Sequence, residues 1–156
     1  MSTGFDTEIS AGPQSGLRLF AKDDAHFPRD SRLLEAEERE DRIRTVFGLE
    51  RNQSLPQVGR WALRAYYEYL ADHLALPFRA RYWDESNPLQ GDCHVVTVVG
   101  LINPRKRRCD DSSGLVCLVR IGKRLLEVPL AELELRGDAA NSALIEDYWF
   151  WFWNWR

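Results

Sequence analysis

The stretch FRARYWDESNPLQGDCHVVTVVGLI, residues 78–102, decides the fold of this chain. Its opening, residues 78–83, alternates apolar and polar side chains, as a strand with one buried face does. The middle, residues 84–92, is rich in residues that form turns. The end, residues 93–102, is β-branched and apolar on both faces, which is typical of a central strand. The stretch therefore predicts two neighbouring strands joined by a turn.

Two further strands are predicted at residues 115–121 and 124–128. The sequences LVCLVRI and RLLEV flank Gly122-Lys123, which suits a two-residue hairpin turn. Pro129 cannot donate a backbone hydrogen bond, so it limits the last strand to an edge or an end of the sheet. Because the strands follow one another with no helix between them, the sheet is predicted to be antiparallel.

Three helices are predicted around these strands. The first follows Ser31 as its N-cap and stops at Gly48, and its acidic and basic side chains lie three or four residues apart. The second begins at the capping-box sequence SLPQ, residues 54–57, and ends near residue 75. The third begins at about residue 139, after Asp138 as its N-cap. Two helices, four strands and a last helix predict an α+β fold.

The chain ends in the aromatic sequence DYWFWFWNWR, residues 147–156. One face of a helix would collect four large apolar side chains there, those of Leu144, Tyr148, Trp151 and Trp155. Such a face suits the covering of an open sheet, so core filling is the first interpretation. Phe150, Trp153 and Trp155 cannot all face inward, so some of them must reach the N-terminal helices, a partner or solvent. A partner surface is therefore the second interpretation. Membrane attachment is third, because Arg156 is the only cation of this ending.

Length and composition indicate one domain. The chain has 156 residues, of which 44% are hydrophobic and 29% are charged. Residues 1–30 show no apolar period and are predicted to be a flexible tail before a single domain at 31–156. A formal net charge of −3 gives no strong attraction to nucleic acid. No apolar run approaches the ~18–20 residues of a membrane-spanning helix, so no membrane association is predicted.

The cysteines point to free thiols rather than to a metal centre. Cys93, Cys109 and Cys117 are an odd number without paired spacing, and no export signal opens the chain. These features predict buried, reduced thiols in a cytoplasmic protein. A zinc site is disfavoured, because Cys93 and His94 are neighbours on a strand and point to opposite faces.

Oxygen ligands gather in one place, the first turn of the sheet. Calcium needs six to eight oxygen ligands, and the sequence has no EF-hand loop. The best cluster of oxygen-bearing side chains is Asp84, Glu85, Asn87 and Asp92. The other interpretation is that these residues serve turn geometry alone.

Three stretches together resemble a known family. They are LPFRARYWDESNPLQGD at 76–92, GKRLLEVPLAELE at 122–134 and ALIEDYWFW at 143–151. In this order and spacing they resemble the small calcium-binding protein family typified by cyanobacterial CcbP. The matching residues are Pro77, Phe78, Ala80, Pro88, Leu89, Gly91, Asp92, Leu126, Val128, Pro129, Leu130, Leu133, Asp147, Phe150 and Trp151. The resemblance covers roughly residues 58–152.

The resemblance implies both a fold and a function. The fold would be a helical N-terminal part packed on a small antiparallel sheet, SH3-like or barrel-like. The function would be non-enzymatic calcium binding, with calcium as the ligand. The predicted ligands are Asp84, Glu85 and Asp92, with carbonyl groups of the turn between them. Asp147 is a rival ligand, although its place within a helix suits a capping or packing bond better.

The alternative function is an interaction module. Its binding surface would be the basic loop Arg105, Lys106, Arg107 and Arg108 with the remaining exposed aromatic side chains. The partner would be an acidic protein or, less expected, nucleic acid. The competing interpretation of the loop is a solvated turn balanced by Asp110 and Asp111. No sequence motif indicates catalysis, so an enzyme is not predicted.

Overall fold

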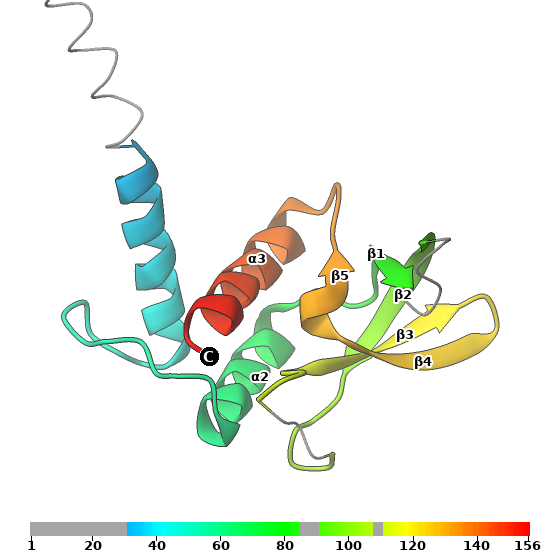
Figure 1. The fold of residues 1–156 in the computed structure, drawn as a ribbon, viewed down its shortest axis with the longest axis horizontal. Helices are drawn as coiled ribbons and strands as arrows, with labels where there is room; N and C mark the ends of the chain where they lie inside the picture. Colours follow the sequence, from blue (N-terminus) through cyan, green and yellow to red (C-terminus); the bar gives the residue numbers. More distant parts are fainter. Residues whose placement is uncertain (1–30, 85–90, 108–110) are drawn as a thin grey trace, which may run out of the picture. The chain divides into compact units, whose positions relative to one another are not determined.

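The structure is a computed structural model that describes residues 31–84, 91–107 and 111–156. It divides into two compact units, residues 1–40 and 41–156. Residues 31–40 of the first unit are helical. The second unit opens with helical residues 41–46 and carries every other element (Figure 1).

The second unit contains a five-stranded antiparallel sheet. Its strands are β1 Phe78–Asp84, β2 Asp92–Leu101, β3 Val116–Ile121, β4 Arg124–Pro129 and β5 Leu133–Glu134. They lie in the order β4-β3-β2-β1-β5, so β4 and β5 form the two edges (Figure 1). The α+β class and the four predicted strands are confirmed. The sheet is open, which corrects the expectation of a barrel.

The sequence pattern does not predict the edge strand β5. After β4 the chain forms a short 3-10 helix, η1 Leu130–Glu132, and then returns to β1. Only two pairs join β5 to β1, Arg81 with Glu134 and Tyr82 with Leu133. A strand of two residues has no periodicity for a sequence pattern to show.

The predicted start of the second helix is wrong. Helix α2 is Arg60–His73, and its N-cap Gly59 makes no side-chain capping bond. The backbone just before it is bound to the C-terminal end of the chain instead of starting a helix. Pro56 O accepts a hydrogen bond from Trp151 Nε1 at 2.9 Å, and Val58 N donates to Trp155 O at 2.7 Å. These tertiary bonds override the local capping pattern.

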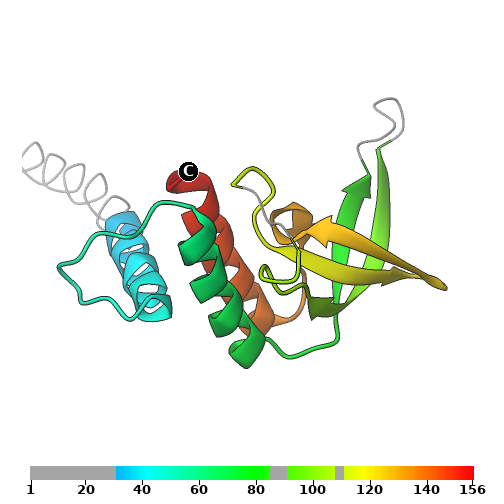
Figure 2. The ribbon, with the colours of Figure 1, turned by 90° about the horizontal axis from the view of Figure 1, so that it is seen from below.

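Helix α3, Ala139–Asn154, begins where the sequence predicts, with Asp138 accepting a bond from Asn141 N at 3.2 Å. It lies beside α2 (Figure 2). Its aromatic side chains fill the core, since Tyr148, Trp151 and Phe152 are at most 1% exposed. Core filling by the aromatic ending is therefore confirmed for these three rings.

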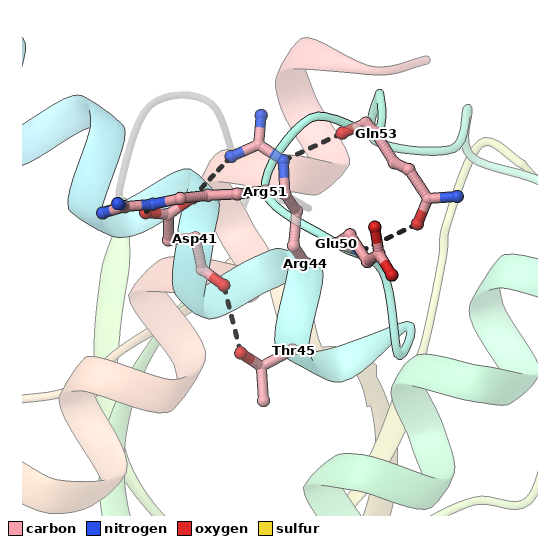
Figure 3. A network of polar contacts seen from close by, with 6 residues as sticks. All are labelled: Asp41, Arg44, Thr45, Glu50, Arg51 and Gln53. Carbon is pink, nitrogen blue, oxygen red and sulfur yellow. Dashed lines mark hydrogen bonds and ion pairs between the residues drawn. The ribbon is translucent and has the colours of Figure 1, made fainter.

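A network of hydrogen bonds and ion pairs stabilises the loop before α2 (Figure 3). Asp41 receives Arg51 Nε at 2.8 Å on one carboxylate oxygen and Arg44 Nη1 at 2.8 Å on the other. Arg44 also donates from Nε to Gln53 O at 2.9 Å. The bond from Arg51, with its charge and that of Arg44, lowers the pKa of Asp41. The network thus ties the end of the helix at 41–46 to the loop at 47–53.

None of the helices in the described residues is long and apolar enough to span a membrane.

Candidate metal centre

The ends of β1 and β2 bring two carboxylates together. Asp84 is the last residue of β1, Asp92 is the first of β2, and the two are direct partners across the antiparallel ladder. Directly opposite residues point to the same face, with their Cβ atoms about 4.5–5.5 Å apart. Asp92 is exposed and Asp84 is partly exposed. A solvent-accessible pair of carboxylates therefore stands at the end of the hairpin.

This pair supplies part of the ligand set that calcium needs. Glu85 and Asn87 lie outside the described residues, together with the rest of the turn at 85–90. Within the described residues, no group of three or more His, Cys, Asp or Glu side chains could hold a metal ion. Asp84 and Asp92 offer at most four carboxylate oxygens, and calcium takes six to eight. Carboxylate oxygens are ligands that a divalent cation accepts, and Asp84, Glu85 and Asp92 stay predicted ligands.

The hairpin end projects beyond the core. Pairing of β2 with β3 begins only at Thr97, so the residues of β2 before it have a neighbour on one side alone. Val95 is 65% exposed as a result, and Cys93 is exposed opposite Trp83. The prediction that this strand is buried on both faces is wrong for its first half. The same projection makes the carboxylate pair accessible.

The cysteines form no metal centre in the described part of the chain. Cys117 is buried, and its Sγ donates to Val128 O at 3.2 Å. Burial raises the pKa of the Cys117 thiol to about 12. Cys93 is exposed, which corrects the expectation that it is buried, and Cys109 lies outside the described residues.

Two arginines of the basic loop are paired with acids of other elements. Arg105 Nη2 lies 3.7 Å from Glu68 Oε1, and Arg107 forms an ion pair with Glu127. In the described residues these two cations are therefore paired with Glu68 of α2 and Glu127 of β4. Arg108 and Asp110 lie outside the described residues. The loop edges a hollow of about 240 Å³ lined by Leu63, Pro104 and five basic residues: Arg60, Arg64, Arg105, Lys106 and Arg107.

The rival ligand Asp147 is engaged elsewhere. Its carboxylate accepts two hydrogen bonds from the guanidinium of Arg42, at 2.8 and 3.0 Å. Asp147 lies on α3, and its side chain is 11% exposed. Asp147 therefore makes the packing bond that its place in a helix suggested.

A family model described as calcium binding, of the CcbP type, matches residues 61–152. The matched region includes all five strands and the carboxylate pair Asp84 and Asp92. The chain belongs to the CcbP calcium-binding family. The family resemblance seen in the sequence is thereby confirmed.

Two solved structures of the CcbP type share this fold. One is the crystal structure of Anabaena CcbP, with a TM-score of 0.52, 22% identity and coverage of 74% of this chain and 89% of that one. The other is described as a calcium binding protein in the calcium-binding form, with a TM-score of 0.55, 23% identity and the same coverage. At these identities the likeness shows the fold. No curated protein matches the chain.

Proposed function

We propose that this member of the CcbP family is a non-enzymatic protein that binds calcium at the turn between β1 and β2. The ligands are Asp84 and Asp92, completed by Glu85, by turn carbonyls and by water. The observation that carries the proposal is the direct cross-strand pairing of Asp84 with Asp92. Membership of a calcium-binding family supports calcium as the ion.

The physical argument is the electrostatics of the pair. The strand register holds the Cβ atoms of Asp84 and Asp92 about 5 Å apart, so their two carboxylates repel each other. A divalent cation between them replaces the repulsion with two attractions. Calcium tolerates irregular oxygen geometry, so a hairpin turn that offers carboxylates, carbonyls and water suits it better than it suits magnesium.

Isothermal titration with calcium tests the proposal. The wild-type protein is compared with the double variant Asp84→Asn/Asp92→Asn, which keeps the shape and removes both charges. We expect measurable calcium binding by the wild type and at least tenfold weaker binding by the double variant.

The matched control is Asp72→Asn, which removes one exposed carboxylate from α2, away from the hairpin. It should bind calcium like the wild type. Equal affinity in the wild type and the double variant would place the site elsewhere. Absence of binding by the wild type would end the calcium proposal for this chain.

A further inference from the structure

A groove of about 930 Å³ lies between α3 and the edge of the sheet formed by β1 and β5. Its apolar floor includes Leu133 of β5 and Ile145 of α3, both at most 5% exposed. Figure 1 labels α3, β1 and β5. The volume is at the upper end of the ~300–1,000 Å³ typical of ligand sites.

Three half-exposed tryptophans line this groove. Trp83 of β1 is 48% exposed, and Trp149 and Trp153 of α3 are 46% and 49% exposed. The latter two rings meet edge to face, with centroids 6.4 Å apart and planes at 84°. The indole Nε1 of Trp149 donates to Ala131 O, which fixes that ring against η1. These are anchored aromatic surfaces of the kind found at binding sites.

The rim of the groove is acidic. Four carboxylates from the strands, η1 and α3 line it, those of Asp84, Glu132, Glu134 and Glu146, and the described lining contains no basic residue. Glu134 is paired with Arg136 at 3.0 Å and is therefore partly balanced. Glu146 is exposed on α3, one helical turn before Trp149. The groove as a whole presents negative charge beside aromatic faces.

Aromatic faces beside carboxylates bind cations that carry apolar carbon. The ring face attracts the cation, the carboxylate pairs with it, and the floor accepts the methylene stem. The chain already places a guanidinium over one of these rings, because Arg156 Cζ lies 5.0 Å from the ring centroid of Trp153. Lysine and arginine side chains have the chemistry that this groove complements.

We propose that the groove binds a lysine- or arginine-bearing segment of a partner protein. The groove is larger than one side chain requires, and β5, which lines it, is an edge strand of the sheet. Leu133 N of this strand already donates to Leu130 O, so an extended segment would gain its affinity mainly from several side chains along the groove. A free small cation reaches only one part of the groove and makes fewer of these contacts.

Titration with synthetic peptides tests the proposal, with tryptophan fluorescence as the readout. The probe is a capped peptide of alternating arginine and alanine, and the comparison peptide carries citrulline in place of every arginine. A calcium chelator is present throughout, so the result does not depend on the proposed metal site. We expect the citrulline peptide to bind at least tenfold more weakly, and added salt to weaken the arginine peptide.

Two groove variants locate the binding, each with a control outside the groove. Glu146→Gln should weaken the arginine peptide about threefold and Trp153→Leu about fivefold. Glu68→Gln and Trp61→Leu change the same residue types on α2 and should leave the affinity unchanged. Glu146→Gln substitutes an exposed residue, so it reports on the groove even if Trp153→Leu misfolds.

Three outcomes would overturn the proposal. One is equal binding of the arginine and citrulline peptides. Another is equal weakening by the groove variants and their controls, which would place the binding on another surface. The third is that arginine amide binds as tightly as the peptide, which would make a small organic cation the occupant.

Discussion

Arg42 and Asp147 form a bidentate ion pair between segments 105 residues apart in the chain. Arg42 Nε lies 2.8 Å from Asp147 Oδ2, and its Nη2 lies 3.0 Å from Oδ1. The pair joins the helical turn at 41–46 to the middle of α3. Asp147 is 11% exposed and Arg42 is 52% exposed, so the carboxylate depends on this partner more than the guanidinium does.

Replacement of Arg42 should therefore destabilise the fold. The change Arg42→Met keeps the apolar stem and leaves Asp147 charged and mostly buried, which we expect to cost about 1–3 kcal/mol. The measurement is urea unfolding followed by circular dichroism. The control is Arg51→Met, whose partner Asp41 is shared with Arg44 and whose side chain is 87% exposed. It should cost less than about 1 kcal/mol, and equal losses in the two variants would contradict the argument.

Substitution of two glycines with positive φ distinguishes the stability cost of backbone strain from the cost of side-chain crowding. Gly114 has φ +64°, and a Cβ there would lie 2.5 Å from Tyr148 Oη and 2.7 Å from Phe152 Cε2. Gly122 has φ +59° and nothing within 4 Å of such a Cβ. Alanine at 122 should cost about 1–2 kcal/mol for the left-handed conformation alone. Alanine at 114 adds about 1–3 kcal/mol of crowding in the core.

Unfolding of Gly114→Ala and Gly122→Ala by urea measures the difference. A larger loss for Gly122→Ala would show that the aromatic side chains of α3 do not press on residue 114. The loss of the bond from Leu115 N to Tyr148 Oη, 2.9 Å in the native protein, would accompany any shift of that ring.

The buried thiol of Cys117 predicts a pH dependence of stability. Its pKa is about 12 in the folded protein against an ordinary value of 9.0, because burial disfavours the thiolate. The unfolded chain therefore loses this proton first, and the stabilisation falls as pH rises from 9.0 towards about 12. Relative to Cys117→Ala, the wild type should lose about 1.4 kcal/mol per pH unit in this interval.

Urea unfolding of both proteins at several pH values between 8 and 11 provides the test. A constant difference across these values would mean that the thiol is not shielded in the fold. Alkylation supplies an independent check at neutral pH. The exposed Cys93 should react in the native protein, and Cys117 only after unfolding.

The elements that carry strong local patterns were predictable. The turn formers at 84–92 and the glycine at 122 set both hairpins, and the N-cap Asp138 set the start of α3. The start of α2 was not predictable, because the bonds from Trp151 and Trp155 to residues 56 and 58 exist only after the helices pack. Local propensity is a weak prior against such contacts.

The two proposed binding surfaces also differ in whether the sequence predicts them. The opposition of Asp84 and Asp92 follows from a hairpin register that the turn dictates, so sequence reasoning reached it. The groove joins residues from β1, η1, β5 and α3, and no spacing in the chain relates them. A signal was present in Trp153, one of the aromatic residues near the end of the chain that cannot all face inward.

Asp84 belongs both to the carboxylate pair and to the lining of the groove, which predicts antagonism between calcium and a basic segment. This prediction rests on both proposals. Calcium at Asp84 would cancel negative charge at one end of the groove, so saturating calcium should weaken the arginine peptide about twofold to fivefold at constant ionic strength. By linkage, the peptide should weaken the affinity for calcium by the same factor.

The variant Asp92→Asn separates the two effects, because Asp92 does not line the groove. That variant should bind the peptide as the wild type does without calcium, and added calcium should no longer affect it. Unchanged peptide affinity in a wild type shown to bind both ligands would mean that calcium is held away from Asp84.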